Sequence, residues 1–141
     1  MAALEQILLA YVAAWNEMDL GKRRMLLETS WAENGIYSDP TAQVSGREAL
    51  VQHLGRLIEH FADQRVLLTS GVDEHHGLIQ FTWARVGSDG KKIRKGIDFG
   101  EVGADGRLVR ITGFFDPPPP IPPTFPEDLV LQGESAGKFP S

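Results

Sequence analysis

The hydrophobic pattern of the chain changes near Asp63, and this change limits the possible folds more than any other feature. Before Asp63 the apolar residues mostly recur with the period of a helix, and after it they alternate with the two-residue period of a strand. Helices followed by consecutive strands are typical of an α+β domain with a mostly antiparallel sheet. We therefore expect three N-terminal helices packed in one strongly curved sheet.

The three expected helices lie at about residues 4–15, 22–31 and 47–61. The first carries apolar residues at i, i+3, i+4, i+7, i+8 and i+11, a stripe that buries Tyr11 together with Trp15. The second turns Trp31 inward, and we interpret its basic run, residues 22–24, as a solvated turn.

Four strands are expected after Asp63, at about residues 65–72, 78–86, 95–101 and 108–115. Two of them place large apolar side chains on one face. These are Ile79, Phe81 and Trp83 on the second strand, and Ile111 and Phe115 on the last, where the small Gly113 lies between them. Basic residues precede the third strand, and we interpret them as an exposed cluster that protects a sheet edge: Lys91, Lys92, Arg94 and Lys95.

The third strand has an acid in its middle. Alternation places Asp98 on the same face as Gly96 and Gly100, neither of which has a side chain. Two glycines beside one carboxyl group indicate a bend, or space for another group to approach the backbone. Asp98 could instead be exposed on a solvated face, but the aromatic walls expected on both sides favour a buried acid at the floor of an apolar pocket.

Composition excludes several classes of function. The net charge of −5 and the pI near 5.3 give no electrostatic reason to expect binding to nucleic acid or to an anionic membrane. The chain has no cysteine, which excludes disulfides, thiolate nucleophiles and zinc-thiolate sites. Its start lacks a basic segment and no apolar run approaches the length of a membrane span, so we expect a cytoplasmic protein.

Five short strings together resemble the SnoaL-like branch of the NTF2-like superfamily, the α+β cone that also includes ketosteroid isomerase. They are Tyr-Val-Ala-Ala-Trp-Asn at 11–16, Tyr-Ser-Asp-Pro at 37–40, Gly-Arg-Glu-Ala-Leu at 46–50, Gly-Ile-Asp-Phe at 96–99, and two strings within 105–116. The resemblance implies an NTF2-like cone-shaped barrel. It assigns residues 1–116 to a SnoaL-like domain and leaves 117–141 as a proline-rich tail, which we interpret as a strap over a neighbouring surface or subunit.

The resemblance also implies a chemistry. Ketosteroid isomerase uses a tyrosine and a protonated aspartic acid as an oxyanion hole, and a second aspartate, before a proline, as the base. These roles fall on Tyr11, Asp98 and Asp39 of this chain. The residues expected to contact a substrate are Trp15, Trp31, Phe81, Trp83, Ile111, Gly113 and Phe115. The implied activity is an isomerase or cyclase that transfers protons on a small hydrophobic carbonyl compound, without a metal or cofactor.

Two alternatives stay open at this point. NTF2-like domains also serve as non-catalytic modules that bind a small hydrophobic ligand or dimerise. Limonene-epoxide hydrolase, a relative with the same cone, uses two aspartates and an arginine, for which Asp98 and Asp116 could supply the acids, although Gly96 stands where the arginine would be. We also expect a homodimer, because Val66, Leu68 and Phe99 would otherwise leave an apolar patch on the outer sheet face.

Overall fold

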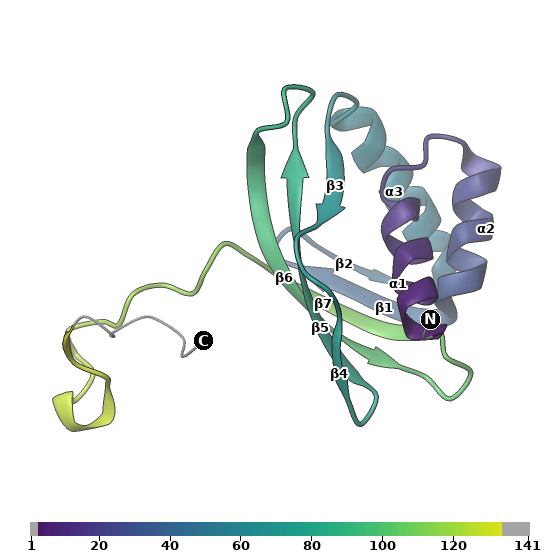
Figure 1. Cartoon of the computed structure of the whole chain (residues 1–141). Coiled ribbons are helices and arrows are strands. Elements are labelled where there is room, and N and C mark those ends of the chain that lie inside the picture. The colour runs from purple at the N-terminus through teal and green to yellow at the C-terminus, as the bar shows by residue number, and fades with distance from the viewer. Residues whose placement is uncertain (1–2, 134–141) are drawn as a thin grey trace.

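The computed structural model describes residues 3–133 and shows three helices on one side of a curved sheet (Figure 1). Residues 134–141 of the expected tail lie outside the described range. The helices are α1 (Ala3–Ala14), α2 (Leu20–Ser30) and α3 (Arg47–His60). The strands are β1 (Trp31–Asp39), β2 (Ala42–Ser45), β3 (Arg65–Leu68), β4 (Asp73–His75), β5 (Leu78–Val86), β6 (Lys92–Val102) and β7 (Leu108–Phe115).

The seven strands form one sheet in the order β2-β1-β7-β6-β5-β3, with β4 also paired to β5. All pairs are antiparallel except β1 with β7, where the early strand lies parallel to the last one. The sheet curves without closing. This is the NTF2-like α+β cone, which confirms the fold class expected from the sequence.

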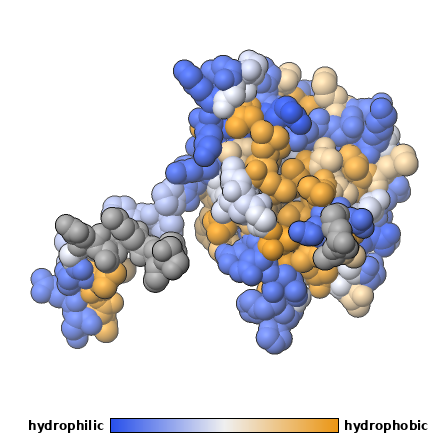
Figure 2. Space-filling model, viewed as in Figure 1, coloured by the Kyte–Doolittle hydropathy of each residue, from blue (hydrophilic) through white to orange (hydrophobic). Residues whose placement is uncertain are grey.

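The core lies between the helices and the concave face of the sheet. The stripe of α1 supplies Leu8 and Tyr11, and α3 supplies Leu50 and Leu54, all at most 3% exposed. In the view of Figure 1, hydrophobic residues gather in the middle of the body and hydrophilic ones around them (Figure 2). None of the helices within residues 3–133 has the length and apolar character needed to cross a membrane.

The basic run 22–24 lies in α2, within the expected second helix, but its interpretation as solvated was wrong for Arg23, which is buried. Asp19 caps the helix by accepting a hydrogen bond from the Lys22 backbone N–H. Arg23 is only 6% exposed, and its guanidinium donates to the carbonyl oxygens of Val51 at 3.2 Å and Glu17 at 3.1 Å. Arg23 thus joins α2 to α3 and to the loop before α2.

Trp31 is the first residue of β1, although the sequence pattern placed it at the end of a helix. Its side chain is fully buried. The pairing of β1 with β7 shifts register between Trp31 and Ile36, and Gly35 lies in this irregular stretch. A Cβ on Gly35 would be 2.6 Å from the Trp31 indole nitrogen, so the glycine makes room for the ring.

The outer face of the sheet carries a different apolar set from the one expected. Val66 is buried and Leu68 packs against the core, whereas Leu67 between them is 38% exposed. Phe99 and Phe114 lie edge to face on the exposed side, with ring centroids 6.2 Å apart. Dimerisation through this face stays a prediction. The residue of β3 that such a dimer would bury is Leu67, not Val66 or Leu68.

The tail leaves the body after Asp116 and extends away from it (Figure 1). Its described part holds one short 3-10 helix, η1 (Glu127–Leu129). Several of its apolar side chains are exposed, namely Ile121, Phe125, Leu129 and Leu131.

Candidate functional site

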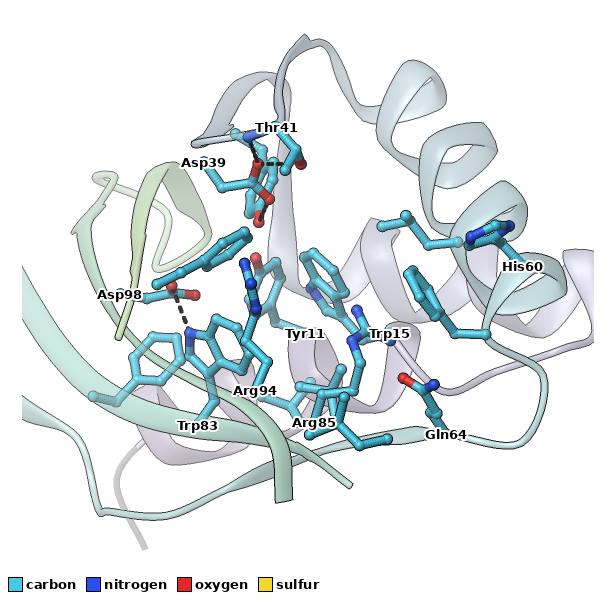
Figure 3. A pocket seen from close by; sticks show the side chains of 18 residues that line it. Tyr11, Trp15, Asp39, Thr41, His60, Gln64, Trp83, Arg85, Arg94 and Asp98 are labelled. Carbon is cyan, nitrogen blue, oxygen red and sulfur yellow. Dashed lines mark hydrogen bonds between the residues drawn. The ribbon is translucent and has the colours of Figure 1, made fainter. Parts of the chain in front are cut away.

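A cavity of about 470 Å³ lies between the helices and the concave face of the sheet. Strands β1, β5, β6 and β7 line it on the sheet side, and α1 and the end of α3 line it on the other. Tyr11, Asp39 and Asp98, the three residues that the resemblance singled out, all line this one cavity (Figure 3). The volume is within the range of small-molecule sites.

Asp98 lies in the middle of β6 with its side chain buried among aromatic rings. It is 6% exposed, and its Oδ1 accepts a hydrogen bond of 2.9 Å from the Trp83 indole N–H. Burial raises the pKa of Asp98 from 3.8 to about 7, the Trp83 hydrogen bond opposes this rise, and the nearby charge of Asp39 adds to it. Near neutral pH a substantial fraction of Asp98 is therefore protonated.

The glycines around Asp98 make room for protein side chains. A Cβ on Gly96 would come within 2.4 Å of the Trp83 ring, and one on Gly100 within 2.6 Å of Ile111. A Cβ on Gly113, which pairs with Asp98 across β6 and β7, would lie 2.6 Å from the Asp98 carboxyl. The space expected beside Asp98 is thus filled by the Trp83 ring, which Gly96 allows to lie against the strand.

Asp39 ends β1 and accepts four hydrogen bonds. It lies close to Asp98, because a Cβ on Gly113, on the strand between them, would be 3.7 Å from the Asp39 Cβ. Oδ1 accepts from the Thr41 N–H and hydroxyl, both at 2.7 Å, and from the Ala42 N–H at 3.0 Å. Oδ2 accepts from the Tyr37 hydroxyl at 2.5 Å. A carboxyl group that accepts at both oxygens has the hydrogen-bond pattern of an ionised carboxylate.

Tyr37 is a member of this site that the sequence interpretation missed. It is 3% exposed, and burial raises the pKa of its hydroxyl above the ordinary value. The signal was available, because Tyr37 precedes Asp39 by two residues and a strand places such residues on the same face.

The Tyr11 hydroxyl is buried and has no hydrogen-bond partner among the described residues. In Figure 3 it points toward the space between Asp39 and Asp98. Burial raises the pKa of Tyr11 well above its ordinary value, and the charge of Asp98 adds to the rise. The Trp15 indole N–H has a smaller, opposite effect on this pKa, but it is not aligned to form a hydrogen bond with the hydroxyl. An unpaired buried hydroxyl is costly, so a ligand oxygen that accepts from it would gain binding energy.

The expected substrate contacts fall into two groups. Trp15, Phe81, Trp83 and Phe115 line the cavity. Three others lie behind its wall: Trp31 stacks on Tyr11 at 5.5 Å, Ile111 is fully buried beside Gly100, and Gly113 backs Asp98.

Asp116 is exposed and does not line the cavity. It therefore cannot act with Asp98 as the second acid of an epoxide-hydrolase site.

Other polar residues line the cavity that the sequence interpretation did not assign to it, including Thr41, His60, Gln64, Arg85 and Arg94. Arg94 belongs to the basic cluster expected at a sheet edge. This cluster is exposed, and its part of β6 pairs with β5 alone, because the pairing of β6 with β7 begins at Gly96. The sequence interpretation missed only that Arg94 also lines the cavity. Within residues 3–133, no three His, Asp or Glu side chains gather in a way that could hold a metal ion.

Comparisons with known proteins identify the fold and the family of the chain. A solved structure of a SnoaL-like family protein from Agrobacterium tumefaciens strain C58, for which isomerase activity has been suggested, shares 32% identity over 82% of this chain and 99% of its own, with a TM-score of 0.76. A protein from Sinorhizobium meliloti, for which polyketide cyclase activity has been suggested, shares 13% identity over 80% of this chain and 97% of its own, with a TM-score of 0.61.

A SnoaL-like protein of unknown function from Burkholderia thailandensis shares 17% identity over 82% of this chain and 96% of its own, with a TM-score of 0.63. No curated protein matches the sequence. The family profile described as the SnoaL-like domain matches residues 8–111, which include Tyr11, Asp39 and Asp98. The chain therefore belongs to the SnoaL-like family.

Proposed function

We propose that the chain is an isomerase or cyclase that transfers a proton on a small hydrophobic carbonyl compound without a cofactor. Asp39 acts as the base, and Asp98 and Tyr11 donate hydrogen bonds to the carbonyl oxygen. The observation that carries this proposal is the contrast between the two acids of one cavity. Asp98 is buried with a pKa of about 7, while Asp39 accepts hydrogen bonds at both oxygens.

Burial equips Asp98 to act as a hydrogen-bond donor. A carboxylic acid that stays protonated can donate to an oxygen on which negative charge develops. Since Oδ1 accepts from the Trp83 N–H, the proton is carried by Oδ2. The unpaired hydroxyl of Tyr11 supplies a second donor.

The reaction then proceeds through an enolate. Asp39 removes a proton from the carbon next to the carbonyl, the C–H electron pair moves into a carbon–carbon double bond, and the carbonyl oxygen becomes negative. Tyr11 and Asp98 stabilise that oxygen. An isomerase returns the proton from Asp39 to another carbon, whereas in a cyclase the enolate carbon attacks a second carbonyl carbon, whose oxygen takes up the proton. The isomerase activity suggested for the Agrobacterium relative supports this class of reaction.

The test is turnover of a small β,γ-unsaturated ketone, cyclohex-3-en-1-one, to its conjugated isomer, followed by ultraviolet absorption. We expect Asp39→Asn to lower turnover by about 10²- to 10⁴-fold, the usual contribution of a positioned general base. Asp116→Asn is the matched control, because Asp116 is an exposed acid outside the cavity, and it should leave turnover unchanged. Failure of the native chain to isomerise this ketone and larger β,γ-unsaturated ketones, or full activity in Asp39→Asn, would refute the proposal.

One observation favours a second candidate, a non-catalytic module that binds a small hydrophobic ligand. Asp39 accepts four hydrogen bonds, so its lone pairs are already occupied in the ligand-free chain. A binding module predicts that Asp39→Asn leaves ligand affinity nearly unchanged and that no ketone is turned over. The cytoplasmic location and the homodimer remain predictions from the sequence.

A further inference from the structure

Two arginines line the same cavity as the two acids. Arg85 on β5 and Arg94 on β6 are directly opposite each other in the antiparallel pair. Like charges in this position repel and destabilise a sheet. The strands therefore hold two positive charges side by side, on the part of the sheet that approaches the β5–β6 hairpin.

Neither guanidinium is paired with an acid in the part of the chain that the structure describes. Within residues 3–133, neither has a carboxylate within 4.0 Å and neither donates a hydrogen bond to another residue. Burial is the main cause that lowers the pKa of the half-buried Arg85; the Tyr37 hydroxyl opposes this effect and the charge of Arg94 adds to it. Each arginine could donate up to five hydrogen bonds, so the pair has many unused donors.

Each arginine stacks on an aromatic ring, and Arg94 is otherwise exposed. The Arg85 guanidinium carbon lies 4.4 Å from the centre of the Phe61 ring, and that of Arg94 lies 4.7 Å from the centre of the Phe115 ring. Both rings belong to the cavity lining. A planar cation held over an aromatic ring loses less freedom on binding an anion than a free surface side chain does.

We propose that Arg85 and Arg94 bind an anionic oxyacid group, a carboxylate or a phosphate, on the hydrophobic ligand of this cavity. The proposal rests on the proposed function and narrows its substrate class to carbonyl compounds that are also anions. A guanidinium recognises either group through paired hydrogen bonds. Binding the anion would also relieve the repulsion between the two arginines.

The strands set the layout of such a ligand. Asp98 and Arg94 are four residues apart on one face of β6, which is about 13 Å between their Cα positions. Phe81 and Trp83 lie opposite the intervening stretch, paired with Asp98 and Gly96. The ligand therefore has its reacting carbonyl near Asp98, an apolar middle against Trp83, and its anionic group near the arginines. In Figure 3 both arginines rise from the same side of the cavity as Trp83.

Calorimetric titration of the full chain with three probes that share a naphthalene ring tests the proposal. The probes are 2-naphthoate, 2-naphthyl phosphate and the neutral 2-naphthamide. We expect one of the two anions to bind about tenfold tighter than the amide, the gain typical of charge-assisted hydrogen bonds. Tighter binding of the naphthoate identifies a carboxylate ligand, and tighter binding of the phosphate identifies a phosphate ligand.

Variants locate the effect. Arg85→Gln and Arg94→Gln should each remove most of the preference for the anion. Lys95→Gln is the matched control, because Lys95 is a cation next to Arg94 that points to the other face of the strand and does not line the cavity. It should retain the preference. Loss of a like-charge pair and loss of a cation–π contact have opposite effects on stability, so we expect the arginine variants to stay folded.

Three results would overturn the inference: equal affinity for all three probes, no measurable binding of either anion, or an equal loss in Lys95→Gln. Its failure is distinct from that of the proposed function. If the chain isomerises neutral ketones but shows no preference for anions, only the inference about the arginines fails. If it prefers anions but isomerises neither neutral nor anionic β,γ-unsaturated ketones, the proton-transfer function fails and the anion site stands.

Discussion

Asp39 and Asp98 lie close together on the concave face of the sheet, on either side of Gly113. The chain surrounds their carboxyl groups in opposite ways. Asp39 accepts four hydrogen bonds, two of them from backbone N–H groups. Asp98 accepts one, from the Trp83 indole, and is otherwise buried among apolar groups. The first environment favours a charged carboxyl and the second a neutral one.

The difference follows from where each acid lies on its strand. Asp39 is the last residue of β1, where the chain turns and the N–H groups of Thr41 and Ala42 are free to donate. Asp98 is in the middle of β6, which pairs with strands on both sides, so the neighbouring backbone N–H groups are used within the sheet. Only a side chain can reach Asp98. A strand end and a strand middle thus give the same residue type two different hydrogen-bonding environments.

We expect the largest effect on stability from Asp98→Asn, which should change how the free energy of unfolding depends on pH. The pKa of Asp98 is about 7 in the folded chain and 3.8 ordinarily, so between these values the folded state holds a proton that the unfolded state has released. The free energy of unfolding of the native chain should therefore fall by up to about 4 kcal/mol as the pH rises from about 4 through about 7. Urea unfolding at pH 4 and pH 8 measures this fall.

Asp98→Asn should remove the part of this decrease in unfolding free energy that Asp98 causes. The histidines and the other acids titrate in both chains, so their contribution cancels when the two chains are compared. If the pH dependence of the native chain matches that of Asp98→Asn, the Asp98 carboxyl is not kept neutral and the contrast between the two acids is lost.

A smaller effect is expected for Gly96→Ala, which disturbs the surroundings of Asp98 but not those of Asp39. The added Cβ would lie 2.4 Å from the Trp83 ring and 2.5 Å from the Phe114 carbonyl oxygen. Overpacking of this kind costs about 1–3 kcal/mol. Because the displaced ring also withdraws its N–H from Asp98, the pH range over which native stability falls should move upward.

The control for this change is Gly71→Ala, where a Cβ would meet nothing within 4 Å. Urea unfolding over a series of pH values compares the two variants. Equal stability of Gly96→Ala and Gly71→Ala would show that the Trp83 ring does not depend on the glycine.

The smallest effects, and opposite ones, are expected from removing the two tyrosine hydroxyls. Tyr37→Phe removes one donor from Asp39 and should lower stability by about 1 kcal/mol. Tyr11→Phe removes a buried hydroxyl that has no partner within residues 3–133, so stability should rise by about 1 kcal/mol while turnover falls. Thermal unfolding of both variants and the ketone assay test this. Destabilisation by Tyr11→Phe would mean that its hydroxyl has a partner in the free protein.

The sequence predicted the parts of the fold and site that depend on periodicity. Alternation in the late strands placed Asp98 inward with Phe81 and Trp83, and the resemblance to a family brought Tyr11 and Asp39 to the same place. Parallel pairing of β1 with β7 joins segments that are far apart in the chain, and no local pattern encodes it.

Residues that depend on register or on tertiary contacts were missed. Arg85 and Arg94 meet only because of the pairing between β5 and β6, which shifts register just beyond Arg85. A basic residue near a hairpin has the same local pattern whether it is solvated or faces a cavity. Arg23 was likewise missed, because the carbonyl groups that it binds belong to other segments of the chain.

The parallel pairing of β1 with β7 also has a kinetic consequence. Tyr37 pairs with Ile111, so residues 74 positions apart in the chain must meet before the two acids share a cavity. Contacts of high sequence separation form slowly, because closing a long loop costs entropy before any contact rewards it. The helices and the β5–β6 hairpin can form from local contacts alone. During synthesis, the cavity therefore stays incomplete until β7 has left the ribosome, and the arrangement of the two acids is among the last features of the chain to form.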